Sequence, residues 1–213
     1  MHGPIGGLGR GTLALLVGAW MVASGGCSSS VTTAPPGLGT PFPPPSSPAA
    51  TMRSFQWSWE NRSLTQYRGL FDATLGESCD STAVAWNRND ELQSFDHMIE
   101  GGGALAVPDR IRLDFSAVTA APDTRPGRDP RWHQIASSPF QLALSGAGMS
   151  PVRLVGTALF EVVRGDSASI PGELTAQGVT PDSTRWYIAR MAFVRDPSQL
   201  DSTTWCGLRQ RYR

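Results

Sequence analysis

The sequence predicts an α+β fold in which N-terminal helices pack on a strongly bent antiparallel sheet. Two observations indicate this class: apolar residues at helical spacing over residues 51–71, and four later segments in which apolar and polar residues alternate. The chain has 213 residues, 40% of them apolar, which suits one domain with one core. Acidic and basic residues number 18 each. The chain therefore lacks the excess of positive charge that would favour nucleic acid as a partner.

Two short amphipathic helices are predicted within residues 51–71, separated by a break at residues 61–63. Ser63 can cap the second helix, and Gln66 three positions later completes a capping-box pattern. Spacings of i, i+3 and i+7 mark one apolar face on each helix. These faces consist of Met52, Phe55, Gln56 and Trp59 in the first helix and of Leu64, Tyr67 and Phe71 in the second.

A weak strand is expected over residues 72–79 and a third helix over residues 90–100. Asn89 can cap this helix, and the acidic residues that follow it suit the positive end of the helix dipole. Three glycines at 101–103 then stop the helix. Its inward face would consist of Leu92, Phe95 and Met98 or Ile99.

Four antiparallel strands complete the predicted domain. They span residues 111–115, 140–144, 152–163 and 185–195. One side of the last strand is uniformly apolar, so we expect that side to face the helices. The residues on this side are Tyr187, Ala189, Met191 and Phe193, and the preceding strand adds Gly156, Ala158 and Phe160.

A ligand pocket is predicted between this sheet face and the helices, because glycine and alanine at 156 and 158 leave room there. We expect Tyr67, Phe160, Tyr187 and Met191 to line it, with Tyr67 as the polar group near its mouth. The alternative is that these four side chains pack together in a filled core.

Residues 1–27 have the features of an export signal and are set apart from the fold. Arg10 precedes an apolar run that is too short to span a bilayer, and the run ends in Ser24-Gly25-Gly26-Cys27. This ending resembles the lipobox of bacterial lipoproteins, in which the cysteine carries a diacylglyceryl group. It departs from that motif at Ser24, where an aliphatic residue is usual. The alternative is an ordinary secretory signal that is cut nearby.

Residues 28–50 are rich in serine, threonine and proline and show no apolar periodicity. Such a composition cannot form a packed core. The proline run favours an extended stalk between the signal and the domain, and the alternative is a linker without a spacing role.

The order of the elements is that of the nuclear transport factor 2-like superfamily, also called SnoaL-like, a cystatin-like cone. Residues 57–62 and 67–71 resemble the opening of that fold. Residues 89–92, 163–168 and 181–188 are similar to a set of uncharacterised bacterial lipoproteins with this fold. Those proteins end in Thr-Trp-Gly, whereas this chain has Cys206 between the tryptophan and the glycine. The resemblance implies a fold and a location, and it carries no activity.

Together these inferences predict a membrane-anchored lipoprotein of the bacterial cell envelope, facing the periplasm or the exterior. Its folded domain would span residues 51–213, with a C-terminal tail from about 197. We expect the domain to bind a small apolar ligand or a protein partner without catalysis.

Two alternatives stay open. The first is an enzyme of the dehydratase or isomerase type that transfers a proton in the same pocket, for which Tyr67, Asp96, His97 and His133 are the candidate groups. The second is a structural envelope protein that uses its sheet as an interaction surface, for instance to form a homodimer.

Cysteine use is sparse. If Cys27 is lipidated, Cys79 and Cys206 remain, and in an oxidising envelope they are expected to pair or else to stay as free buried thiols. No metal site is predicted, because the cysteines and histidines lack the spacing of known metal motifs. No cofactor is predicted either, since the chain has no phosphate-binding loop or dinucleotide fingerprint.

Overall fold

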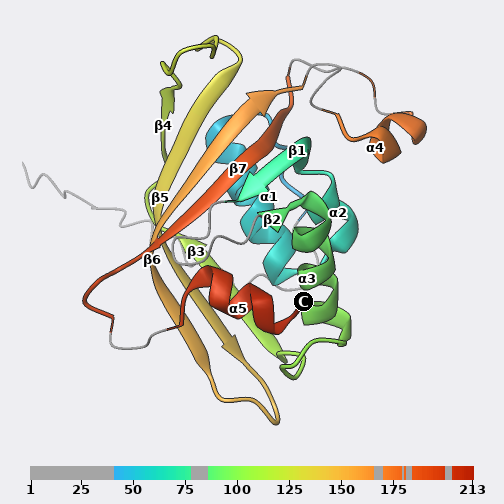
Figure 1. Cartoon of the computed structure of the whole chain (residues 1–213), viewed down its shortest axis with the longest axis vertical. Coiled ribbons are helices and arrows are strands. Elements are labelled where there is room, and N and C mark those ends of the chain that lie inside the picture. The colour runs from blue at the N-terminus through green and yellow to red at the C-terminus, as the bar shows by residue number, and fades with distance from the viewer. Residues whose placement is uncertain (1–40, 78–85, 166–169, 179, 181–183, 200–202) are drawn as a thin grey trace, which may run out of the picture. The chain divides into compact units, whose positions relative to one another are not determined.

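A computed structural model describes residues 41–77, 86–165, 170–178, 180, 184–199 and 203–213 (Figure 1). The predicted order of two helices, a strand, a third helix and four further strands is confirmed, and two short strands at Trp86–Asn87 and Thr119–Pro122 were not predicted. The helices are α1 (Pro48–Glu60), α2 (Leu64–Arg68), α3 (Arg88–Glu100), α4 (Gly172–Ala176) and α5 (Trp205–Arg211). The strands are β1 (Phe71–Glu77), β2 (Trp86–Asn87), β3 (Arg110–Phe115), β4 (Thr119–Pro122), β5 (His133–Ser145), β6 (Val152–Arg164) and β7 (Trp186–Arg195).

One sheet joins these strands in the order β2-β1-β7-β6-β5-β3, and β4 also pairs with β5. All pairs are antiparallel except β1 with β7, which is parallel. The long strands β5, β6 and β7 twist strongly, and α1, α2, α3 and α5 lie together on one side of them (Figure 1). The predicted packing of helices on a bent antiparallel sheet is therefore confirmed, except that β1 pairs with β7 in parallel.

Helix α1 begins inside the segment that was predicted to be linker. The Ser47 hydroxyl accepts a hydrogen bond from the backbone N–H of Ala50 at 3.1 Å, and Pro48 occupies the first helical position. Serine as a cap followed by proline is a strong helix start, because proline lacks an N–H that would be unpaired there. The folded domain therefore extends further towards the N-terminus than residue 51.

Proline-rich residues before α1 pack on the domain as well. The ring of Phe42 lies edge-on against Trp57, with centroids 5.3 Å apart. The Pro43 carbonyl accepts a hydrogen bond from the Ser54 hydroxyl at 2.7 Å. The Pro45 carbonyl accepts one from the backbone N–H at the start of β7 at 2.9 Å. Residues 42–45 thus form a docked segment, called the proline strap below.

The break between α1 and α2 lies where the sequence predicts it. Arg62 has a φ of 53°, a left-handed conformation that few non-glycine residues adopt, and it turns the chain between the helices. Ser63 caps α2 by accepting a hydrogen bond from the backbone N–H of Gln66 at 3.4 Å. However, α2 ends at Arg68, and Phe71 starts β1 instead of extending the helix. Phe71 is nevertheless fully buried, since the strand carries it into the same core.

Helix α3 starts two residues earlier than predicted. Its cap is Asn87, not Asn89. The Asn87 side chain accepts a hydrogen bond from the backbone N–H of Asp90, and the Asp90 carboxylate accepts one from the backbone N–H of Asn87. This reciprocal capping box satisfies two backbone donors. The predicted stop is confirmed: Gly101 follows the helix with a φ of 96°, which glycine adopts without strain.

Aromatic side chains fill the space between the helices and the sheet. Phe55 of α1 lies at the centre, and the centroids of its ring neighbours are 5.0–6.4 Å away. These neighbours come from α1, α2, α5 and four strands: Trp59, Tyr67, Phe71, Phe115, Phe160, Phe193 and Trp205. The main core is therefore a packed aromatic cluster.

A β-bulge in β7 corrects the predicted faces of that strand. Glu161 of β6 pairs with Arg190, whereas the next residue of β6 pairs with Ile188, so Ala189 is an extra residue. Ile188 therefore faces the main core, and Tyr187 packs in a separate cluster with Val163, on the opposite side. The prediction assumed that side chains alternate strictly between the two faces along β7. One inserted residue reverses the faces of the residues before it.

The segment predicted as a C-terminal tail contains α5, which packs into the core. Thr204 caps this helix by accepting a hydrogen bond from the backbone N–H of Gly207 at 3.0 Å. Trp205, Leu208 and Tyr212 are buried in the main cluster. Their spacing of three and seven residues is that of an amphipathic helix, so a short helix closes the end of the domain.

Candidate functional site

The four residues predicted to line an apolar pocket are all fully buried. Tyr67, Phe160 and Met191 belong to the main core, and Tyr187 lies in the second cluster beyond the bulge. None of the four lines either of the two surface hollows described below. Their arrangement matches the alternative of a filled core.

The small residues at 156 and 158 have a different role from the one predicted. A Cβ at Gly156 would lie 2.0 Å from the Val194 carbonyl oxygen, so glycine is needed there for β7 to approach β6. Ala158 is fully buried. The room that these residues leave is therefore occupied by the neighbouring strand and by aromatic rings.

A buried ion pair lies within this core. The Glu91 carboxylate of α3 accepts hydrogen bonds from Arg209 Nη2 at 2.7 Å, from Trp86 Nε1 at 3.0 Å and from the Tyr67 hydroxyl. Arg209 Nη2 also donates to the Glu91 carbonyl at 2.6 Å, and its guanidinium lies over the ring of Trp59 at 5.2 Å. Both charged side chains are 0% exposed. Four separate elements thus meet at one carboxylate.

The environment of this ion pair affects the acidity of Tyr67. Burial raises the pKa of the Tyr67 hydroxyl well above its ordinary value, and the negative charge of Glu91 raises it further. Tyr67 therefore stays protonated and donates to the carboxylate. The hydrogen-bonded side chains of Tyr67, Glu91 and Arg209 connect α2, α3 and α5 inside the core. None of the three lines either surface hollow.

The structure separates the other candidate proton-transfer groups. His97 Nδ1 lies 2.9 Å from the Tyr212 carbonyl oxygen, so this side chain connects α3 to the end of α5. Asp96 is half-buried on α3. His133 starts β5 and lines a hollow on the other side of the sheet. These residues do not form one site with Tyr67.

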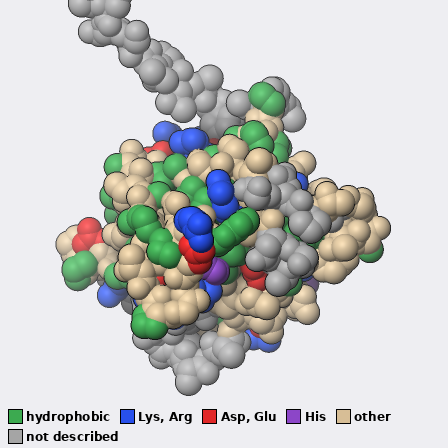
Figure 2. Space-filling view, turned by 90° about the horizontal axis from the view of Figure 1, so that it is seen from above, with side chains coloured by type: hydrophobic (Ala, Val, Ile, Leu, Met, Phe, Trp, Pro, Cys, Tyr) green, Lys and Arg blue, Asp and Glu red, His purple; other side chains and the backbone are tan. Residues whose placement is uncertain are grey.

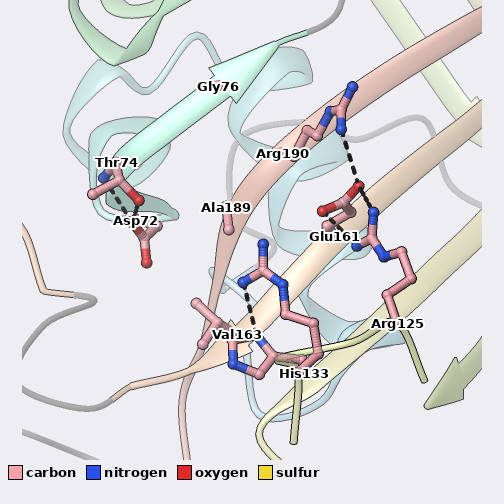
Figure 3. Close-up of a pocket in the computed structure, with 10 residues that line it drawn as sticks. Asp72, Thr74, Gly76, Arg125, His133, Glu161, Val163, Ala189 and Arg190 are labelled. Carbon is pink, nitrogen blue, oxygen red and sulfur yellow. Dashed lines mark hydrogen bonds and ion pairs between the residues drawn. The ribbon is translucent and has the colours of Figure 1, made fainter. Parts of the chain in front are cut away.

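A hollow of about 410 Å³ opens on the sheet face that points away from the main core (Figure 3). Glu161 and Arg190 line it, and they alternate along their strands with the core residues Phe160 and Met191. The hollow draws its lining from β1, β5, β6, β7 and the loop between β4 and β5. The complete lining is Asp72, Thr74, Gly76, Arg125, Arg128, His133, Glu161, Val163, Ala189 and Arg190.

Arg125 organises the charges on one wall of this outer hollow. Its guanidinium binds Asp123 at 2.6 Å and Glu161 at 2.7 Å. The hydrogen bonds from Arg125 lower the pKa of the Asp123 carboxyl to about 2. Glu161 also lies 3.7 Å from Arg190 Nη1. Two strands and a loop are thus joined by alternating charges.

Charged side chains of both signs lie on the surface of the domain. Figure 2 shows acidic, basic and histidine side chains gathered near the middle of the face seen from above, with hydrophobic side chains beside them. Arg128 Nη1 lies 3.5 Å from His133 Nδ1 at the edge of the outer hollow. On the far side, Asp72 accepts hydrogen bonds from the backbone N–H and the hydroxyl of Thr74 at 2.6 and 2.7 Å.

A second hollow of about 460 Å³ lies between β1, the start of α3 and the start of α4. Its lining is mostly uncharged, with Arg88 as its one charged residue, and Arg88 Nη2 donates to the Arg68 carbonyl at 3.1 Å. The outer hollow is the stronger candidate, because several charged side chains converge on it.

Within the described ranges, no group of three or more histidine, cysteine, aspartate or glutamate side chains is placed to hold a metal ion. No described helix is both long enough and apolar enough to cross a bilayer. Cys206 in α5 is disulfide-bonded. Cys27 and Cys79 lie outside the described residues, so lipidation of the first and pairing of the second with Cys206 remain predictions.

Sequence reasoning missed most of the residues that matter here. Glu91 was interpreted only through the helix dipole, and Arg209 lay in the predicted tail. Arg125 and Arg128 lie in a polar loop rich in proline, where the sequence shows no pattern. The one available signal was the alternation in β6. It places Glu161 on the other face of the strand from its apolar neighbours in sequence.

No protein-family model and no curated protein sequence matches the chain. Several solved structures are similar to it in fold. A nuclear transport factor 2-like superfamily protein from Salmonella enterica is 9% identical, with a TM-score of 0.47 over 72% of this chain and 92% of that one. A candidate scytalone dehydratase from Novosphingobium aromaticivorans is 9% identical, with a TM-score of 0.49 over the same shares. A protein with a cystatin-like fold from Nostoc punctiforme is 12% identical, with a TM-score of 0.44 over 71% and 90%.

The fold is nuclear transport factor 2-like. This assignment rests on the order and pairing of the elements in this chain, with the helices on one face of a curled sheet. It is an assignment of architecture, and the activity has to be argued from the site.

Proposed function

We propose that the chain is an exported, lipid-anchored envelope protein whose folded domain binds a ligand or partner on the outer face of its sheet without catalysis. The export and anchoring part rests on Ser24-Gly25-Gly26-Cys27 after a short apolar run. The linker that follows would hold the domain away from the membrane surface.

One observation carries the binding part of the proposal. The interior that would hold an apolar ligand is filled with aromatic rings around Phe55, whereas a hollow of about 410 Å³ opens on the opposite face. Pockets of roughly 300–1,000 Å³ suit small molecules. Binding is therefore proposed at the outer hollow and not inside the cone.

The alternative of a proton-transfer enzyme requires an acid or base that a substrate can reach in the interior. Tyr67 and Glu91 hydrogen-bond to each other in the fully buried core, with Arg209 as the counter-charge. This arrangement supports a structural role for these groups, so the non-catalytic function is preferred.

Anchoring is tested by replacing Cys27 with serine in the full chain. We expect the wild-type chain to fractionate with membranes and to carry an acylated N-terminal cysteine at position 27 by mass spectrometry. The Cys27→Ser variant should accumulate as an unprocessed precursor without acyl groups. A wild-type chain that starts at any other residue contradicts the proposal.

Binding at the outer hollow is tested by filling it. Ala189→Trp places a large side chain in the hollow, and Val194→Trp is the matched control, because Val194 lies on the same strand and is already 46% exposed. Small molecules that raise the melting temperature of the wild-type chain should also do so for the Val194 variant and should fail with the Ala189 variant. Equal binding to both variants would place the ligand elsewhere.

A further inference from the structure

We propose that the outer hollow binds a small organic anion, with a carboxylate or phosphate group on a short apolar body. The anionic group would lie against Arg128 and Arg190, and the apolar body would lie on Val163 and Ala189. This inference rests on the proposed function and adds the chemical class of the ligand and its orientation.

The floor of the hollow is a product of the β-bulge. Because Ala189 is the inserted residue, both Ala189 and Arg190 line the outer hollow, although neighbouring residues of a regular strand would point to opposite faces. Ala189 carries only a methyl group, and the largely buried Val163 lies beside it. The result is a small apolar floor between charged walls (Figure 3).

One wall of the hollow is held rigid. Arg125 is bound by Asp123 and by Glu161, at 2.6 and 2.7 Å, so its guanidinium is fixed in place. The charge of Glu161 is in turn shared between Arg125 and Arg190, with the second distance at 3.7 Å. This carboxylate is therefore compensated before any ligand arrives. A rigid wall costs a ligand little ordering on binding.

Arginine is the most frequent charged residue on the lining. Three arginines and two carboxylates line the hollow, and Asp123, which does not line it, pairs with Arg125. Arg128 lies at the edge beside His133, 3.5 Å from its Nδ1, and it is exposed. A guanidinium can bind a carboxylate or phosphate through two parallel hydrogen bonds. Arg128 is therefore placed to bind an anionic group at this end of the hollow.

Asp72 sets the direction of the ligand. It lies across the hollow from Arg125 and Glu161, next to Thr74, which donates two hydrogen bonds to it (Figure 3). Its negative charge repels an anionic group from that end. The anionic group is therefore directed to the end at Arg128, and the apolar body extends over Ala189.

The test uses the purified full-length chain and four probes with the same ring: benzoate, phenyl phosphate, benzyl alcohol and benzylamine. Binding is measured by isothermal titration calorimetry at low salt. We expect benzoate or phenyl phosphate to bind saturably and both other probes to bind at least about tenfold more weakly, since charge-assisted hydrogen bonds are the strong ones. The two anionic probes distinguish carboxylate from phosphate as the preferred group. Binding should weaken as salt is added, because the contacts are partly exposed.

Three variants locate the site. Arg128→Ala should weaken binding of the anionic probe by about tenfold or more, and Ala189→Trp should abolish it. Arg131→Ala is the matched control, because Arg131 lies in the same loop, is 85% exposed and does not line the hollow. Its binding should equal that of the wild type. Arg128 is an exposed loop residue, so its variant is expected to fold, which near-UV circular dichroism checks.

Two results would overturn the inference, and they differ in what they leave standing. If benzyl alcohol binds as tightly as the anions and Ala189→Trp abolishes this binding, the ligand class is wrong and the outer hollow remains the binding site. If no anionic probe binds at millimolar concentration, or if Arg128→Ala and Ala189→Trp bind as the wild type does, the anion site is wrong. The anchoring at Cys27 is measured separately and is unaffected by either result.

Discussion

Arg209 is expected to be among the residues on which the stability of the domain depends most, and Arg209→Met tests this. Methionine keeps most of the apolar stem and removes the charge, so Glu91 is left buried without its counter-charge. The wild-type guanidinium donates at 2.7 Å to the carboxylate and at 2.6 Å to the carbonyl of Glu91, and both side chains are 0% exposed.

The magnitude follows from this burial. Removal of one partner of a buried ion pair costs about 3–5 kcal/mol, because the remaining charge has no solvent to stabilise it. That is a large part of a typical total stability of about 5–15 kcal/mol. The double variant Glu91→Gln with Arg209→Met carries no buried charge, so it should be more stable than the single variant by about 1–3 kcal/mol.

Urea denaturation followed by tryptophan fluorescence measures both free energies of unfolding. Arg211→Ala is the control, because Arg211 is exposed on the same helix and should change stability by no more than about 0.5 kcal/mol. If Arg209→Met lies within about 1 kcal/mol of the wild type, or if the double variant is no more stable than the single one, stability does not depend on this ion pair.

Three further predictions follow from the packing, the acidic groups and the cysteines. Ala158→Trp should lower the free energy of unfolding by at least about 1–3 kcal/mol, since Ala158 is fully buried in a filled core, and an unchanged melting temperature would indicate an open cavity instead. The pKa of Asp123 is about 2 in the folded domain, against an ordinary value of 3.8, so its stabilising contribution is complete above 3.8 and is lost as the pH falls through 2. Asp123→Asn should remove this part of the acid dependence in a pH series of melting temperatures, and an identical series for both proteins would contradict it. The predicted Cys79–Cys206 disulfide should leave no reactive thiol from these two residues in the unfolded, unreduced chain, and two reactive thiols would exclude it.

Local signals in the sequence predicted α1, α2, α3 and the main strands well, whereas α4 and α5 were not predicted. Ser63 and Gly101 are caps and stops whose effect depends on the few residues around them, and both act as expected. Burial of Phe55 and Trp59 follows from helical spacing alone. The predicted length of α2 was wrong at Phe71, because an apolar residue at that spacing is equally suited to the start of a buried strand.

Features that depend on distant parts of the chain were not predictable in the same way. The bulge at Ala189 arises from the pairing of β7 with β6, and no residue in β7 marks it beforehand. Glu91 and Arg209 are 118 residues apart in sequence and meet only because α5 packs against α3. The outer hollow depends on the bulge, which forms its floor, and on contacts between distant segments, because its walls come from a loop and four strands.

The proline strap determines where a mechanical load would enter the domain. Phe42, Pro43 and Pro45 are joined to α1 and to the first residue of β7 before the chain reaches α1. A pull on the chain from its N-terminal side therefore acts first on these contacts, and the cap of α1 at Ser47 bears tension only after they have parted. The proline strap would therefore protect α1 from tension that reaches the domain through the preceding residues.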